Sequence, residues 1–198
     1  MSGQGVKLER DGVVRVALRL LDEWGLNGVS LRRLAAELGV KAPALYWYFA
    51  SKQELLDEMA EVMLEDHAPP DRPAPGQAWD HWLAERARAH RRAMLAYRDG
   101  ARLHAGTRPT ARHRPVLTGM LEVLGEAGFP PWEAISNVLA ISHYTVGSAI
   151  EQQAAAGRPT PGAGIGSPGV AGYDFDATYE HGLRLLLAGM RHLGASSR

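Results

Sequence analysis

The feature that most constrains the fold is the spacing of apolar residues, which follows the period of an α-helix along most of the chain. In the first segment of this kind, apolar side chains recur three or four positions apart, at Val13, Val14, Ala17, Leu20, Leu21 and Trp24. The same spacing returns in later segments, and no segment alternates apolar and polar residues as a half-buried strand does. The sequence therefore predicts an all-α protein.

Residues 25–54 carry the boundary signals of four consecutive helices. Glycines are expected to end the first two helices, a serine to begin the second, a proline to lie in the first turn of the third, and a capping box to open a longer fourth. In chain order these signals are Gly25, Ser30, Gly39, Pro43 and the box Ser51-Lys52-Gln53-Glu54. The third helix is predicted to start near Ala42 and to span about six residues. Together the three short helices form a predicted N-terminal head.

The rest of the chain is predicted to form a larger helical body. Four prolines within residues 69–75 mark a hinge after the fourth helix. Further helical patterns cover residues 79–97, 116–124, 132–153 and 179–193. The Gly/Pro-rich residues 157–173 are predicted to be a mobile loop. We therefore predict a head at residues 1–52, a connecting helix at 53–67 and a body at 68–198.

Composition and charge limit the classes of partner. The chain has no cysteine, so disulfides and thiolate metal sites are excluded. The N-terminus has no apolar signal-peptide core and no uncharged apolar run approaches about 20 residues, so we expect a cytoplasmic protein with no membrane partner. The net charge of zero is uneven: residues 1–52 sum to +3, 53–70 to −6, 71–120 to +6 and 121–198 to −3. A basic head is compatible with binding to DNA phosphates.

Residues 39–49, GVKAPALYWYF, place four consecutive aromatic side chains after a turn and a proline. Two short helices joined by GVKA are the sequence form of a helix-turn-helix, whose second helix enters the DNA major groove. In that arrangement Leu45 and Phe49 face inward. Tyr46, Trp47 and Tyr48 then point outward, toward phosphates, sugars and thymine methyls. The alternative is that all four rings belong to a core or to a dimer surface, and composition leaves both interpretations open.

A longer segment around this run, VSLRRLAAELGVKAPALYWYFASKQELLDEMAEVML, resembles the DNA-binding domain of the TetR family of transcriptional regulators. Two segments of the body, YRDGARLHAGTRPT and ISHYTVGSAIEQQ, resemble tetracycline-binding members of this family, so the resemblance covers roughly residues 10–155 and 175–193. It implies a ligand-responsive transcriptional repressor that is not an enzyme. Such a protein binds a palindromic double-stranded DNA operator as a homodimer and is released by a small-molecule effector.

The resemblance implies a DNA-binding set in the head. Arg32 would read a guanine edge, because a guanidinium fits O6 and N7 together. Ala42, Pro43 and Ala44 would face bases, and the two alanine methyls stand where tetracycline-binding members have polar groups, which implies a different operator. The other members of the set, which would hold phosphates or flank the reading helix, are Lys41, Tyr46, Trp47, Tyr48 and Lys52. The alternative for Arg32 and Arg33 is a solvated helix face.

The resemblance also implies a ligand cavity in the body, and dimer contacts through the helices at residues 132–153 and 179–193. His104 would bind magnesium directly, while Thr107 and Glu151 would hold it through coordinated waters, as suits an octahedral cation that keeps most of its water shell. No cofactor is expected to be required, apart from Mg2+ bound together with the effector. The predicted ligand-binding set is Arg86, His90, His104, Thr107, Met120, His143 and Glu151.

Part of this pocket departs from the pattern of tetracycline-binding members. Arg86, His90 and Met120 stand where those members have an amide, an aromatic ring and another amide, and Ala68 replaces a histidine. Arg86 and His90 lie one helical turn apart and suit an anionic ligand. The expected effector is therefore a metal-chelated polyketide related to tetracycline, or another oxygen-rich chelator.

Two other classes of function compete with a repressor. The sequence has no Gly-rich phosphate loop that opens a helix, no cysteine nucleophile and no His-x-x-x-His pair, so an enzyme is not expected. The second alternative is a helical small-molecule-sequestering protein without DNA binding. The intact set of Arg32, Tyr46, Trp47 and Lys52 argues against that alternative.

Overall fold

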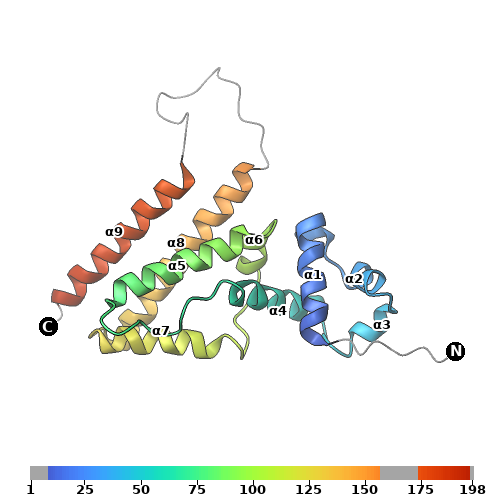
Figure 1. Ribbon diagram of the computed structural model, residues 1–198, viewed down its shortest axis with the longest axis horizontal. Coiled ribbons are helices and arrows are strands. Elements are labelled where there is room, and N and C mark those ends of the chain that lie inside the picture. Colours follow the sequence, from blue (N-terminus) through green and yellow to red (C-terminus); the bar gives the residue numbers. More distant parts are fainter. Residues whose placement is uncertain (1–8, 157–173, 197–198) are drawn as a thin grey trace, which may run out of the picture. The chain divides into compact units, whose positions relative to one another are not determined.

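Every regular element of the described chain is helical. The computed structural model describes residues 9–156 and 174–196, and within them α-helices and one short 3-10 helix are joined by turns (Figure 1). The all-α prediction is confirmed for this part of the chain. The predicted mobile loop at residues 157–173 lies outside the described residues.

The helices group into two compact units. The first contains the described residues up to His67 together with Ala93–His113, and the second contains Ala68–Arg92 and the described residues from Arg114 onward. Residues 93–113 therefore pack with the N-terminal helices, although they follow the proline-rich segment in the chain. The sequence did not predict this grouping. The functional boundaries after residues 52 and 67 stay predictions.

The first unit is built around α1 (Arg10–Trp24) and α4 (Lys52–Glu65), which pack against each other. α2 (Leu31–Glu37) packs against α1 and against the short α3 (Ala42–Leu45), and η1 (Leu26–Gly28) joins α1 to α2. The fully buried apolar residues of this unit include Val13, Val14, Leu21, Leu34, Leu45, Phe49, Leu55 and Met59. Burial stabilises the unit by about 1.5–3 kcal/mol for each large side chain of this kind.

Three predicted helix boundaries are confirmed by their capping contacts. Gly25 follows the last residue of α1 and has a φ of +68°, a left-handed value that suits glycine. At the start of α2, the Ser30 hydroxyl accepts the N–H of Arg33 at 3.2 Å. At the start of α4, the Ser51 hydroxyl accepts the N–H of Glu54 at 3.1 Å. Each cap satisfies a backbone group that has no partner within its helix.

The third helix and the capping box differ from the prediction. α3 has four residues, because the chain leaves the helix after Leu45, whose carbonyl accepts the N–H groups of both Tyr48 and Phe49 at 2.9 Å. The Glu54 carboxylate accepts the N–H of Ala50 at 2.7 Å, one residue before the position that a capping box predicts. The connection between α3 and α4, residues 46–51, is therefore longer than expected.

A short helix that the sequence did not predict, α6 (Gly100–Ala105), follows Asp99. Asp99 has a φ of 57°, and its carboxylate accepts the N–H of Leu26 at 2.9 Å. A Cβ at Gly25 would lie 2.7 Å from the same carboxylate, so space as well as positive φ requires a glycine there. A helix of six residues is too short to be stable by itself, so this long-range contact helps to define it.

The second unit packs four long helices around one apolar core. They are α5 (Trp79–Leu95), α7 (Arg114–Glu126), α8 (Pro131–Ala156) and α9 (Phe175–Ser196). The buried core includes Trp82, Leu83, Val123, Leu124, Phe129, Val138, Ile141, Leu183 and Leu187. All four predicted body helices are present, and their ends differ from the predicted ends by a few residues.

Arginines of α5 tie the helices of the second unit together. Arg88 donates two bonds to the Glu180 carboxylate of α9, at 2.8 and 2.7 Å, and this contact lowers the pKa of Glu180. Arg91 is buried and donates to Asp176 at 2.7 Å and to Gln152 of α8. A buried guanidinium needs such partners, because an unpaired buried charge is strongly destabilising. The sequence did not single out these arginines.

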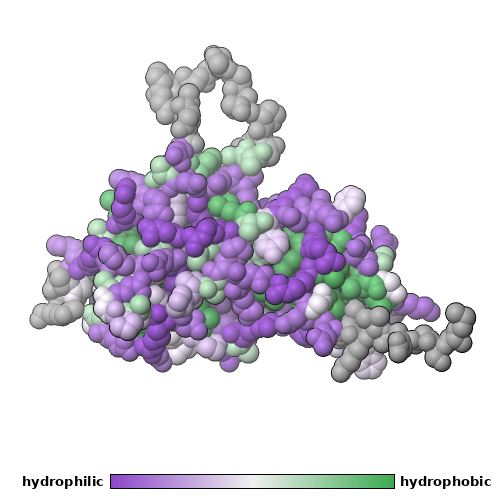
Figure 2. Space-filling model, viewed as in Figure 1, coloured by the Kyte–Doolittle hydropathy of each residue, from purple (hydrophilic) through white to green (hydrophobic). Residues whose placement is uncertain are grey.

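Apolar residues gather in the two cores more than on the surface. The face in Figure 2 is mostly hydrophilic, with hydrophobic residues in separate areas. None of the described helices is long and apolar enough to span a membrane.

Candidate functional site

The four aromatic rings after α3 divide between core and surface. Phe49 is fully buried, whereas Tyr46 is 58% exposed and Trp47 is 91% exposed. Tyr48 is half-buried and so less exposed than its two neighbours. Its carbonyl accepts a hydrogen bond from Arg10 of α1, which holds this residue against the unit. A core role is excluded for Tyr46 and Trp47, which are the aromatic surface that a partner can reach.

α3 presents small side chains beside this aromatic turn. Ala42 and Ala44 are half-buried and Pro43 is exposed, and Lys41 and Lys52 on either side are exposed. Small side chains let a helix approach the base edges of a groove, and flanking lysines are suited to phosphates. One continuous segment, residues 41–52, therefore carries most of the predicted DNA-binding set.

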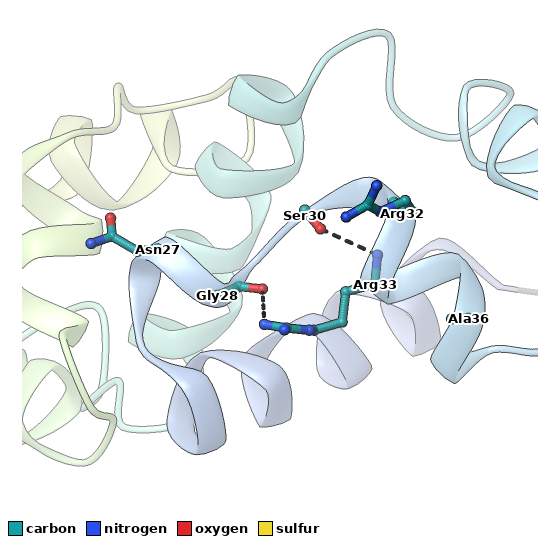
Figure 3. Close-up of a pocket in the computed structure, with 6 residues that line it drawn as sticks. All are labelled: Asn27, Gly28, Ser30, Arg32, Arg33 and Ala36. Atoms are coloured by element: carbon teal, nitrogen blue, oxygen red, sulfur yellow. Dashed lines mark hydrogen bonds between the residues drawn. The ribbon is translucent and has the colours of Figure 1, made fainter.

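Two adjacent arginines near the start of α2 have different surroundings (Figure 3). Arg33 turns toward η1, where it donates to the Gly28 carbonyl at 2.8 Å and lies 4.7 Å from the ring centre of Trp24. Arg32 is exposed, and among residues 9–156 and 174–196 its guanidinium has no hydrogen-bond or ion-pair partner. Both border a surface hollow of about 410 Å3. Arg33 thus has a structural contact, and Arg32 is the guanidinium available to a partner.

Two residues of the predicted effector set lie in the first unit. His104 is in the last turn of α6, where burial, with the nearby His113, lowers its pKa to about 4. The imidazole is therefore neutral at neutral pH, as a metal ligand must be. The Thr107 hydroxyl donates to the His104 carbonyl at 2.9 Å, which leaves its oxygen able to accept a hydrogen bond from a water.

The other residues of this set lie in the second unit. Arg86 of α5 donates to the carbonyls of Pro69 and Pro70, at 3.4 and 3.1 Å, and lies against the ring of Trp82. Burial lowers the pKa of Arg86. The remaining members are His90 and Met120, which are half-buried, and His143 and Glu151, which are exposed on α8. Arg86 anchors the proline-rich segment, so an anionic ligand would share this guanidinium with two backbone carbonyls.

The donor set near His104 limits how a metal can be bound. Within residues 9–156 and 174–196, no group of three or more His, Asp or Glu side chains is arranged to hold a metal ion. A cation at His104 would therefore take most of its ligands from waters and from an effector. Magnesium, which keeps several of its waters in protein sites, fits that requirement.

Comparison with known proteins assigns the chain to one family. Residues 13–59 match the family model "Bacterial regulatory proteins, tetR family", and residues 72–167 match "Tetracyclin repressor-like, C-terminal domain". The tetracycline repressor protein class C of Escherichia coli is 40% identical, and the match covers 94% of this chain and 92% of that protein. The chain belongs to the TetR family.

Two solved TetR structures share the fold over nearly the whole chain. A TetR variant from Acinetobacter baumannii AYE in complex with minocycline has a TM-score of 0.82 and 40% identity, and the match covers 94% of this chain and 98% of that one. The class A TetR in complex with 5a,6-anhydrotetracycline and magnesium has a TM-score of 0.77 and 39% identity, with 93% and 99% covered. TetR family members are DNA-binding transcriptional regulators and not enzymes, so the prediction that this chain is not an enzyme is confirmed.

The first unit also contains contacts that the sequence did not reveal. Arg10 bonds to the carbonyl of Tyr48, and Glu61, buried on α4, accepts two hydrogen bonds from Thr110. The partners in these pairs are 38 and 49 residues apart in the chain. In the sequence, Glu61 stands among the apolar residues of its helix, which could have indicated that its side chain is buried. No feature of the sequence indicated the contact of Arg10.

Proposed function

We propose that this TetR family member is a ligand-responsive repressor that binds a palindromic operator as a homodimer and is released by a small-molecule effector. The observation that carries this proposal is the exposed set of Arg32, Tyr46, Trp47 and Lys52 on the head. Because these side chains are exposed, they can bond to DNA without breaking a hydrogen bond within the folded protein. The alternative, a small-molecule-sequestering protein without DNA binding, gives no reason for this exposed set.

The homodimer is supported by exposed apolar residues in the second unit. Trp132, Ile135 and Leu139 of α8 are 68%, 46% and 47% exposed, and Leu185 and Leu193 of α9 are each 61% exposed. The three α8 residues are three and four positions apart and so share one helix face. Exposed apolar surface of this extent is typical of an interaction site. A second copy on this face would supply a second head, and two heads related by two-fold symmetry read a palindrome.

The effector in this proposal is an oxygen-rich chelator bound together with Mg2+. The relatives described above were solved with minocycline, and with 5a,6-anhydrotetracycline and magnesium. In this chain a neutral His104 can supply one nitrogen ligand, and Thr107 an oxygen that accepts from a coordinated water. Glu151, in the second unit, keeps its role from the family resemblance. Bound Mg2+ would supply the positive charge that holds adjacent oxygens of the chelator.

The chelator is expected to differ from tetracycline, because three residues of the predicted ligand-binding set depart from the family pattern. Arg86 and His90 replace an amide and an aromatic ring of the family pattern, and Met120 replaces another amide. A guanidinium offers only donors and a positive charge, so it favours an acidic or oxyanionic group over an amide partner. We therefore expect a polyketide, or a similar chelator, that carries an acidic group.

The effector signal is proposed to reach the head through α4. Within the first unit, residues 106–112 follow His104 and run along one face of α4. Four pairs of residues make these contacts. From the N- to the C-terminus of α4 they are Gln53 with Gly106, Asp57 with Arg108, Glu61 with Thr110, and Glu65 with Arg112. Successive contacts thus lie four residues apart on α4, about one helical turn, and two residues apart in residues 106–112. A displacement of His104 and Thr107 would thus be passed to α4.

The test begins with a duplex selected from a random pool by the full-length protein. Operator binding is measured by fluorescence anisotropy, and we expect a palindromic site and affinity that falls steeply with salt. A panel of polyketide chelators, with 5a,6-anhydrotetracycline and Mg2+ as the first member, is then titrated for release of the duplex. EDTA and His104→Ala should each abolish release and leave operator binding intact, whereas the exposed His181→Ala serves as the matched control and should behave as wild type.

Each part of the proposal can fail separately. If the pool yields no duplex but a chelator binds, the protein is a sequestering protein and the repressor assignment is wrong. If an effector releases the duplex equally well in EDTA and with His104→Ala, the pocket is purely organic and the metal site is wrong.

A further inference from the structure

Arg10, the first residue of α1, makes four contacts that converge on the turn between α3 and α4. Its guanidinium donates through Nη1 to the carbonyl of Tyr48. Its Nη2 donates to Glu54 Oε1 at 2.7 Å and to Glu58 Oε1 at 3.0 Å. The same group lies 4.6 Å from the centre of the Phe49 ring. One side chain therefore joins α1, the aromatic turn and the first two turns of α4.

Arg10 donates to one polar group of the turn and to one of the adjoining first turn of α4. The Tyr48 carbonyl lies beyond the end of α3 and takes its hydrogen bond from Arg10. The two oxygens of Glu54 have separate partners: Oε1 accepts from Arg10, and Oε2 accepts the N–H of Ala50 at 2.7 Å. The hydrogen bond from Arg10, followed by that from Ala50, lowers the pKa of Glu54, so the carboxylate stays ionised at neutral pH. The middle of the turn and the first turn of α4 are thereby joined to α1.

Tyr46 and Trp47 lie within this turn, between the buried Leu45 and the half-buried Tyr48. With 58% and 91% exposure, their rings have little packing of their own to fix them. We propose that Arg10 is a positioning residue for DNA recognition, which fixes the backbone of the aromatic turn so that Tyr46 and Trp47 are oriented before DNA binds. The proposal rests on the proposed function, because it assumes that these rings contact DNA. Orienting them in advance lowers the entropy lost on binding.

Arg15 provides a matched control on the same pair of helices. It also lies on α1 and donates two bonds to α4, to the carboxylate of Asp66 at 3.0 and 3.2 Å. Asp66 is at the opposite end of α4 from the aromatic turn, so Arg15 joins the two helices without contacting the turn. A general stabilising role of α1–α4 ion pairs would therefore affect Arg15 and Arg10 alike, and a positioning role would affect Arg10 alone.

The decisive experiment is a double-mutant cycle on binding of the full-length protein to the duplex selected by the wild type. Arg10→Met, which keeps the length of the side chain and removes its donors, is combined with the pair Tyr46→Ala and Trp47→Ala. In the wild-type background we expect Arg10→Met to weaken binding by about tenfold, within the range of coupling measured for contacting residues. In the background without the two rings, the same change should cost less than about twofold. Arg15→Met should have little effect in either background.

Three outcomes of this cycle overturn the proposal. Equal losses in both backgrounds would mean that Arg10 acts independently of the two rings. Equal weakening of the selected duplex and of a scrambled duplex, with a salt slope reduced by about one, would mean that Arg10 contacts a phosphate. A similar loss for Arg15→Met would mean a general role in joining α1 to α4. Urea unfolding of each variant identifies losses due to stability. If Arg10→Met does not fold, Arg10→Lys replaces it, because a single ammonium nitrogen cannot occupy the positions of both Nη1 and Nη2.

A readout without DNA separates this proposal from the proposed function. The protein, which has five tryptophans, is labelled with 5-fluorotryptophan, and the Trp47 resonance is assigned by its loss in Trp47→Phe. Arg10→Met should change the shift and width of the Trp47 line in the free protein, and Arg15→Met should not. An unchanged Trp47 line overturns the positioning role even if DNA binding is lost. A changed line, together with normal DNA binding after removal of both rings, leaves the positioning of the turn intact and shows that the assumed DNA contact is wrong.

Discussion

At the scale of single residues, the neighbouring arginines of α2 are expected to differ in their effect on DNA recognition. Arg32 has no partner within the described chain, so its guanidinium is available to a guanine, whose O6 and N7 it fits. Arg32→Ala should weaken operator binding by about 1–3 kcal/mol and relax discrimination at one base position. Anisotropy titrations with duplexes that carry each base at each position of the half-site measure both effects.

Arg33→Ala is the control for that prediction, since it removes a guanidinium from the adjacent position. Its loss frees the Gly28 carbonyl and the face of the Trp24 ring, so a small loss of stability is expected, with no change in base preference. Uniform weakening of every duplex by Arg32→Ala would instead identify Arg32 as a phosphate contact.

At the scale of helices, the row of contacts between α4 and residues 106–112 is expected to depend on its buried member. Glu61 is 5% exposed, and its carboxylate accepts the N–H of Thr110 at 2.7 Å and also the Thr110 hydroxyl. Thr110→Val removes the hydroxyl donor and leaves a buried carboxylate with one partner fewer. We expect the free energy of unfolding to fall by about 1–3 kcal/mol.

Urea unfolding of the full-length protein measures this change. Thr118→Val, at an exposed position of α7, makes the same substitution outside the row and should change stability by less than about 0.5 kcal/mol. Equal stability of the two variants would show that the Glu61–Thr110 contact does not hold residues 106–112 to α4.

At the scale of the whole molecule, the exposed apolar residues of α8 and α9 are expected to control assembly. Leu139 and Leu185 are 47% and 61% exposed, and a glutamate at either position would place a charge in the proposed subunit interface. The double variant Leu139→Glu, Leu185→Glu should be a folded monomer by light scattering. Its operator affinity should fall by more than about a hundredfold, because each head then binds a half-site independently.

Leu117→Glu is the matched control for that variant, since Leu117 is an exposed leucine of α7 outside this apolar face. It should remain a dimer with wild-type operator affinity. A double variant that stays dimeric would place the subunit interface elsewhere on the molecule.

Sequence by itself determined the features that depend on short-range contacts. The spacing of apolar residues predicted helices throughout, and Gly25, Ser30 and Ser51 predicted three helix boundaries that the structure confirms. A cap is decided by groups within about four residues of each other, so local sequence is sufficient to predict it. The resemblance of residues 29–64 to a TetR head likewise identified the segment that carries the candidate DNA-binding surface.

Only the tertiary structure decided which side chains of that segment are held and which are free to act. Arg32 and Arg33 are alike in sequence, and they differ because the packing of α1, η1 and α2 brings Trp24 and Gly28 to Arg33 alone. Arg10 reaches Tyr48 across 38 residues, and Asp99 reaches Leu26 across 73 to define α6. The physical reason is that such contacts exist only once the helices have packed, and neither propensity nor spacing determines which helices will meet.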